Sequence, residues 1–409
     1  MAADILNQKP TSKDSEKNQL KTTEAYNLPT RHSERWKYTD LSRLLANLPF
    51  KAVTDGMFEL IDEKEIEAQL LEHPNRLVFI DGMFSEKYSQ YDHAIMLKLA
   101  RVSDFKSIDY QIHPMVEQIQ KNNENITSVS INKTQDTPFI IFHVFSNRSQ
   151  RKWVEAQLTI SVAEQCNVEI HEKCILLHQK DVVLNGLTLL NLAQASSVVY
   201  TSDQAVDHKS LFAINGLHVY QCRDSQFRYN NIALEASLLR EDIHIHLNEE
   251  GANCNLAGVA FLKDHSHIDY HIIVEHSASY TTSNVDFKAA AANKSIFVCN
   301  PKAIVHSDIK GISAHQNLGN LLFDTTAAID TKPELEIYSD DVQCTHGATI
   351  GQLDEKALFY MQSRGISESC AKELLTEAFL NIVIDDFYCT NKAQQKQLMI
   401  RKISDYYKA

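Results

Sequence analysis

Residues 153–170, WVEAQLTISVAEQCNVEI, set the pattern for the middle of the chain. Apolar and polar residues alternate up to Val162, and the alternation resumes after a short break at Cys166. A period of two is typical of a strand with one buried face, because successive side chains of a strand point to opposite faces. The stretch therefore predicts two half-buried strands separated by a short break.

This pattern returns at a nearly constant interval along the chain. Alternating segments recur at spacings of 29, 28, 28 and 27 residues, centred near Ile160, Leu189, Leu217, Ile245 and Ile272. A second set lies between them, near Val168, Val199, Tyr229, Leu256 and Val285. Because no helical segment separates these strands, the spacing is typical of a solenoid whose coils bury their apolar rows against one another. We predict a mainly β protein with a parallel β-helix core; a β-sandwich with regular hairpins stays open.

Glycine is scarce, with 11 in 409 residues against roughly 7% in average usage. Asparagine and aspartate tolerate left-handed backbone conformations better than most residues and are expected to replace glycine at the turns. The candidates at the breaks in the pattern are Asn185, Asn215, Asp224, Asn230, Asn248 and Asn253.

Composition excludes several functions. The net charge of −13 disfavours a nucleic-acid partner, because an acidic surface repels a phosphate backbone. The glycines form neither GxGxxG nor GxxxxGK[ST], so we expect no ATP site on this chain. The sequence contains no run of about 18 apolar residues, so we expect no membrane-spanning helix. The first residues lack the apolar core of a signal peptide. We expect a cytoplasmic protein.

The domain organisation follows from changes in periodicity. We predict a disordered tail at 1–24, a helix-bearing N-terminal domain at 25–122, a β-helix core at 123–349 and a C-terminal helical domain at 350–409. The N-terminal domain is expected to contain helices at 41–48 and 62–71 and a short strand at the LVFI segment. In the C-terminal domain, an apolar row over 371–383 either faces the β core or forms a docking surface for a partner.

The eight cysteines form no CxxC pair, which argues against a zinc ribbon or a disulfide framework. Cys166 and Cys254 lie within alternating strands and are expected to be small buried hydrophobes. Cys344 and His346 are two residues apart, so on a strand they project from one face. A thiolate beside an imidazole suits iron, zinc or a sulfur intermediate, but two ligands seldom hold a metal without others.

Two His-x-His pairs have the same two-residue spacing as Cys344 and His346, so on a strand the members of each pair also project from one face. On residues 241–247 the odd positions carry the apolar row, so Arg240, Asp242, His244 and His246 fall on the opposite face, which we expect to be solvated. His265 and His267 lie near a turn, and we expect them to be solvated too.

A resemblance to a known family adds to this interpretation. Residues 335–366, LEIYSDDVQCTHGATIGQLDEKALFYMQSRGI, resemble the signature of the SufD family, subunits of the SUF iron-sulfur cluster assembly scaffold. Three further segments resemble the family's N-terminal motif, a middle rung and the last rungs: LPTRHSERWKYTDLSRLL at 28–45, LREDIHIHLNEEGANCNLAGVAFL at 239–262 and NLLFDTTAAIDTKPELEI at 320–337.

The resemblance implies a right-handed parallel β-helix between helical domains. It implies that the core pairs with a related subunit, SufB, and that the C-terminal helical domain docks the ATPase SufC, which supplies the ATP site. The family's Cys-x-His-Gly motif falls on Cys344 and His346, implied ligands of iron or a transient iron-sulfur cluster shared with SufB. The implied ATPase-docking residues are Arg364, Gly365, Leu374, Leu375 and Phe379.

The expected function is a non-catalytic scaffold subunit that contributes to iron entry and to the nascent cluster site at the SufB interface. Reduced flavin in the complex and a homodimer of the isolated chain stay open. One alternative is a stand-alone β-helix enzyme acting on a carbohydrate or acyl substrate, which requires a groove lined with carboxylates. A second alternative is a metal-storage or iron-donor protein that uses the histidines.

Overall fold

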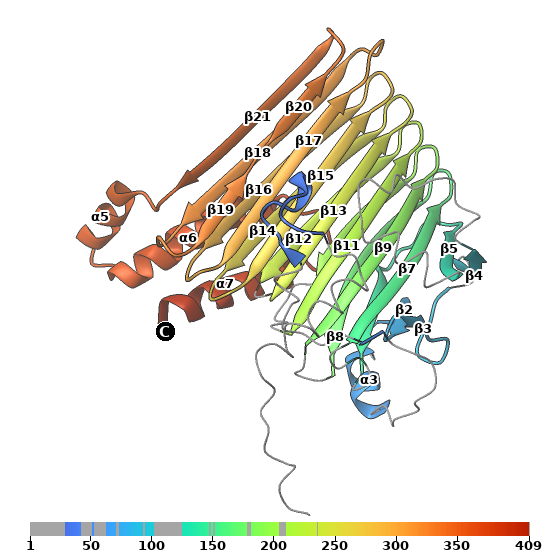
Figure 1. Ribbon diagram of the computed structural model, residues 1–409, viewed down its shortest axis with the longest axis horizontal. Coiled ribbons are helices and arrows are strands. Elements are labelled where there is room, and N and C mark those ends of the chain that lie inside the picture. The colour runs from blue at the N-terminus through green and yellow to red at the C-terminus, as the bar shows by residue number, and fades with distance from the viewer. Residues whose placement is uncertain are drawn as a thin grey trace, which may run out of the picture.

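The alternating segments form a parallel β-solenoid, as their spacing predicts (Figure 1). The computed structural model describes residues 29–41, 51–52, 63–70, 73–92, 95–101, 125–146, 149, 152–177, 181–203, 210–234 and 236–408. The predicted tail at 1–24 and all of the predicted helix at 41–48 beyond Leu41 lie outside these residues.

The elements before the repeat are η1 (Glu34–Trp36), β1 (Lys51–Ala52), α3 (Glu63–Leu70), β2 (Arg76–Ile80), β3 (Met83–Phe84) and β4 (Ile95–Arg101). The repeat begins with β5 (Asn125–Ile131), β6 (Phe139–Phe145), β7 (Lys152–Val162), β8 (Asn167–Leu176), β9 (Val182–Leu192), β10 (Ser197–Asp203), β11 (Leu211–Gln221) and β12 (Gln226–Leu234). It continues with β13 (Leu238–Leu247), β14 (Asn253–Leu262), β15 (His267–His276), β16 (Thr282–Ala291), β17 (Ile296–Val305), β18 (Ile312–Leu322), β19 (Ala328–Thr331), β20 (Glu334–Ile337) and β21 (Val342–Gly351). Three helices follow: α5 (Glu355–Ser363), α6 (Glu368–Asp385) and α7 (Lys392–Lys408).

The strands of the repeat alternate between two sheets. The first sheet runs β19-β17-β15-β13-β11-β9-β7-β5-β4, with β1 paired to β7 and β20 to β17, and the second runs β21-β18-β16-β14-β12-β10-β8-β6-β2-β3. Parallel register stacks equivalent residues of successive coils: Leu217 lies opposite Ile243, which lies opposite Ile272. All three are buried in one continuous cluster between the sheets. Burial against neighbouring coils therefore holds the solenoid together.

Described strands from before residue 123 take part in the solenoid. β2, which contains the predicted LVFI strand, pairs in parallel with β6, and β4 pairs antiparallel with β5. α3 lies within the predicted helix at 62–71, and its buried Ile66 and Leu70 pack against the outward residues of β6. The N-terminal strands thus extend both sheets at one end.

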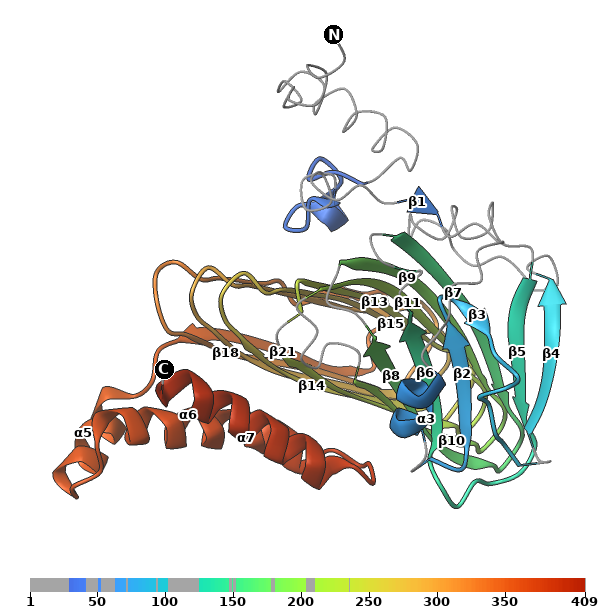
Figure 2. The same cartoon turned by 90° about the horizontal axis from the view of Figure 1, so that it is seen from below.

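The C-terminal helices lie on the outer face of the second sheet. Figure 2 shows α6 and α7 side by side along the solenoid, and α6 packs against β14 and β16. Leu380, Val383 and Ile384 of α6 join an apolar cluster with Val259 and Ala290. This part of the 371–383 row therefore faces the β core, one of the two arrangements that the sequence left open.

The turns only partly follow the prediction. Asp224 has the expected positive φ of 56°, and Asp264, an aspartate outside the candidate set, adopts the same conformation, but so do Gln165 and Ala195 at equivalent turns. The other candidates are not among the residues with positive φ, and four of them lie inside strands: Asn185, Asn215, Asn230 and Asn253. Their prediction as left-handed turn residues was wrong, because asparagine can also lie inside a strand, where the Asn215 amide donates to Glu241.

Within the described residues, no helix is long and apolar enough to cross a membrane.

Candidate functional site

The terminal strand β21 has a special position in the solenoid. It pairs with β18 along one edge, and among the described residues no strand pairs with its other edge. An unpaired edge presents backbone N–H and C=O groups to a partner strand. β21 is therefore one edge at which another sheet can continue this one, at the end of the solenoid next to the C-terminal helices.

Cys344 and His346 lie on one face of β21, as their spacing predicts. Cys344 lies opposite Ala314 and His346 opposite Gln316, and two positions further on Ala348 lies opposite Leu318. Leu318 belongs to the core between the two sheets. Because partners in parallel register share a face, Cys344 and His346 continue the interior row of the solenoid into its last strand.

These two side chains are more accessible than their partners, since no described strand covers β21. Cys344 is half-buried and His346 is exposed, whereas Ala314 and Gln316 are buried. Burial raises the pKa of the Cys344 thiol, and a hydrogen bond with the backbone of Ala314 partly offsets this effect. The thiol is therefore protonated at neutral pH, and a bound metal would be needed to stabilise its thiolate.

Exposed apolar side chains accompany the two candidate ligands. Ile337, Tyr338 and Ile350 have 39%, 63% and 50% of their surfaces exposed. Ile350 is on the same face of β21 as His346, because it is four residues further along the strand. Large apolar groups in this position are typical of a surface that a partner covers.

The five candidate docking residues lie at the C-terminal helices. Arg364 caps the end of α5, with its guanidinium 5.4 Å from the centre of the Tyr360 ring, and Gly365 follows with a φ of 86°. Leu374 is 42% exposed and Leu375 is half-buried. Phe379 instead packs against the solenoid, where its ring lies 4.7 Å from the Lys288 ammonium.

The sequence interpretation missed two further exposed aromatic residues. Phe359 and Tyr360 of α5 are 74% and 60% exposed. An apolar run that ignores the helical period, ALFYM at 357–361, is the signal that could have identified them.

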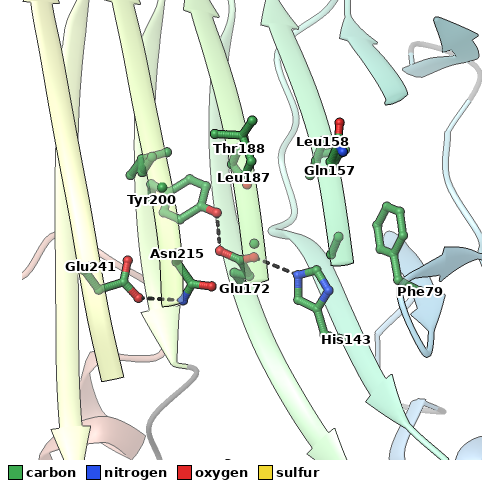
Figure 3. A pocket seen from close by; sticks show the side chains of 14 residues that line it. Phe79, His143, Gln157, Leu158, Glu172, Leu187, Thr188, Tyr200, Asn215 and Glu241 are labelled. Atoms are coloured by element: carbon green, nitrogen blue, oxygen red, sulfur yellow. Dashed lines mark hydrogen bonds and ion pairs between the residues drawn. The ribbon is translucent and has the colours of Figure 1, made fainter. Parts of the chain in front are cut away.

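A polar network lies inside the solenoid (Figure 3). Glu172 of the second sheet bonds to His143 Nε2 at 2.7 Å and accepts a hydrogen bond from the Tyr200 hydroxyl. Across the interior, the Asn215 amide donates to Glu241 at 2.9 Å. Both carboxylates are buried, and the adjoining cavity measures about 20 Å³. That volume suits a single water and excludes a sugar ring, so these carboxylates do not form the groove that the enzyme hypothesis requires.

The outer face of the first sheet is not solvated at Arg240, Asp242 and His244, contrary to the prediction. All three are at most 2% exposed. Arg240 forms ion pairs with Asp242 at 2.8 Å and with Asp269 at 2.6 Å. Trp36 from the N-terminal segment stacks on its guanidinium, whose Cζ atom lies 3.8 Å from the centre of the Trp36 ring. Residues 29–41 cover this part of the sheet, and periodicity within one strand could not reveal that cover.

The predicted solvation of the second His-x-His pair is correct for one member only. His265 is exposed at a turn. His267 is buried, with its Nε2 atom 2.9 Å from the Thr39 hydroxyl. Cys166 and Cys254 are buried, as predicted, at 7% and 1% exposure.

Comparison with known proteins connects these features to one family. Residues 144–379 match the family described as "SUF system FeS cluster assembly, SufBD core domain". The match covers β7 to β21 and extends into α6, so it includes the terminal strand with Cys344 and His346.

Two relatives match along most of their length. The "Iron-sulfur cluster assembly protein SufD" of Escherichia coli is 24% identical over 361 residues, which cover 86% of this chain and 84% of that protein. An iron-sulfur cluster assembly SufBD family protein of Synechocystis is 25% identical over 383 residues, covering 88% and 83%. The SufD of Plasmodium falciparum is 23% identical over 255 residues, which are 62% of this chain but 17% of that protein.

Proposed function

Because the chain belongs to the SufBD family, whose proteins function in iron-sulfur cluster assembly, we propose that it is a non-catalytic scaffold subunit of a complex with SufB and SufC. Its role is to contribute to iron entry and to hold part of the nascent cluster at the SufB interface. ATP is bound by SufC and not by this chain. The cluster is cargo that is built on the complex and then released.

The observation that carries the proposal is the position of Cys344 and His346 at the end of the interior row. Each offers one soft or borderline ligand atom to iron. Two ligands on one subunit leave the coordination incomplete, and groups from SufB would complete it. Incomplete ligation suits a transfer site, because a cluster held by few bonds can be passed on.

The terminal strand supports pairing with SufB through the core. A partner strand that adds to β21 gains backbone hydrogen bonds along its edge. Ile337, Tyr338 and Ile350 would be buried by the same contact. Such an arrangement would enclose Cys344 and His346 between the two subunits.

The C-terminal helices support docking of SufC. Phe359, Tyr360 and Leu374 are exposed on α5 and α6, and the exposed Arg364 lies beside the Tyr360 ring. Aromatic and arginine side chains are frequent anchors of protein interfaces. Phe379 is not proposed as an anchor, because it packs against Lys288.

The cluster site is tested by replacing His346 with alanine in the chain co-expressed with SufB and SufC and purified without oxygen. We expect the iron and acid-labile sulfide content of the complex to fall about tenfold, a typical cost of disturbing a metal site. His315→Ala is the matched control, because His315 is an exposed histidine on the neighbouring strand that bonds to Thr345, on the other face of β21. Equal cluster content in wild type and His346→Ala, with the complex intact, would contradict this assignment.

The two partner surfaces are tested by a crossed pair of charge substitutions. We expect Ile350→Asp to weaken SufB binding at least about tenfold and to leave SufC binding unchanged, because a buried unpaired carboxylate at an interface is costly. Leu374→Asp should have the opposite selectivity. Each variant is the control for the other, and affinities measured with the separate partners decide. If either variant weakened both interactions equally, the two-surface assignment would be wrong.

A further inference from the structure

Three histidines gather on the outer face of the first sheet, away from Cys344 and His346 on the second. His244 and His246 are two residues apart on β13, and His218 of the neighbouring β11 lies opposite His244 in the parallel register. β11, β13 and β15 run side by side in the middle of the sheet (Figure 1). The solenoid therefore places the three imidazoles together although His218 and His244 are far apart in sequence.

The three rings are close and largely shielded from water. One ring nitrogen from each lies within 4.8 Å of the others. His218 and His244 are 0% and 1% exposed, while the His246 side chain retains 16%. Bonds of about 2.0–2.1 Å to a tetrahedral ion require a separation of roughly 3.3 Å between ligand atoms, so a bound ion would draw the three nitrogens closer together.

A carboxylate from the next strand faces the same rings. Glu275 of β15 places one carboxylate oxygen 3.1 Å from His244 Nε2 and the other 3.4 Å from His246 Nδ1. The Glu275 side chain is 25% exposed, so together with His246 it offers a route from solvent. His306 lies beyond it, with its Nε2 atom 3.9 Å from the carboxylate.

Ring packing accounts for part of this geometry, since Tyr220 stacks on His246 with their centres 4.6 Å apart. It gives no reason for three imidazoles and a carboxylate to meet at one point. Neutral imidazoles with one carboxylate are a common donor set for divalent zinc, iron and cobalt. A carboxylate beside ligating histidines also orients their rings and balances the charge of the cation.

We propose that His218, His244 and His246, with Glu275 beside them, form a binding site for one divalent first-row transition metal ion. The ligand nitrogens come from two adjacent strands of the solenoid, and the carboxylate comes from a third. The site is independent of the proposed cluster site, because its residues lie on the other sheet and need no partner subunit to meet.

The test uses Co²⁺ as the probe, added to the purified full chain, because its visible ligand-field absorption reports coordination by imidazole. We expect one Co²⁺ per chain, displaced by Zn²⁺. His246→Ala should weaken Co²⁺ binding at least about tenfold, and Glu275→Gln by about tenfold. His246 and Glu275 are chosen because both side chains are partly exposed, so their variants should fold. His265→Ala, which removes an exposed histidine at a turn, should bind as the wild type does.

A second measurement covers the case in which a variant folds less stably. Co²⁺ should raise the thermal midpoint of the wild type and of His265→Ala, and not that of His246→Ala, because only a bound ion stabilises the folded state. Retention of the Co²⁺ spectrum in His346→Ala would separate this site from the terminal strand. The proposal is overturned if His246→Ala binds Co²⁺ as tightly as wild type, if His346→Ala abolishes the spectrum, or if wild type gives none.

Discussion

Replacing Arg240 by methionine is expected to lower the free energy of unfolding by about 3–5 kcal/mol. The guanidinium is fully buried between two carboxylates, Asp242 at 2.8 Å and Asp269 at 2.6 Å, and it also donates to the backbone oxygen of Arg35 at 2.9 Å. Without it, both carboxylates remain buried and lose their positive partner. That desolvated negative charge is the main source of the loss.

The same substitution should release the N-terminal cover of the first sheet. Trp36 stacks on the guanidinium, and Thr39 donates a hydrogen bond to Asp269. Denaturant unfolding gives the stability, and limited proteolysis within residues 29–41 reports the release. Arg223→Met is the matched control, because Arg223 forms an exposed pair with Glu250 at 2.9 Å and exposed pairs contribute little. Equal stability of the Arg240 and Arg223 variants would show that the buried pairs do not hold this segment.

The second large effect concerns pH and the interior carboxylate Glu241. Burial raises the pKa of Glu241 to about 8; a hydrogen bond from Asn215 opposes this, and the nearby Glu172 and Asp242 carboxylates add to it. In the unfolded chain the group titrates near its ordinary value of about 4.3. The pKa of Glu241 is therefore higher in the folded protein than in the unfolded chain. Because of this, the contribution of protonated Glu241 to the free energy of unfolding is complete below about pH 4.3 and is lost as the pH rises to about 8.

We therefore expect wild type to lose on the order of 3–5 kcal/mol more stability than Glu241→Gln between about pH 4.3 and 8. Glutamine keeps an acceptor for the Asn215 amide and cannot ionise. Comparing the two proteins at each pH cancels the titration of the groups they share. Glu164→Gln, which changes an exposed carboxylate, should follow the wild-type curve. A constant difference between wild type and Glu241→Gln over this range would mean that the folded protein does not hold Glu241 protonated.

The sequence by itself determined the repeat and the strand faces. Alternation over 153–170 and its return every 27 to 29 residues predicted the coils, because a strand with one buried face must alternate. The same rule correctly placed Glu241 on the apolar face of β13 and Arg240, His244 and His246 on the other. The pairing of Cys344 with His346 followed from their spacing alone.

Only the tertiary structure decided what covers each face. Periodicity reports which residues share a face, but it carries no information about a segment 200 residues away, so the cover that Trp36 provides over Arg240 could not be predicted. The meeting of His218 with His244 depends on the register between strands, which is set by packing between whole coils. The accessibility of Cys344 and His346 likewise depends on β21 being the last strand of its sheet, because every other coil buries this row against a neighbour.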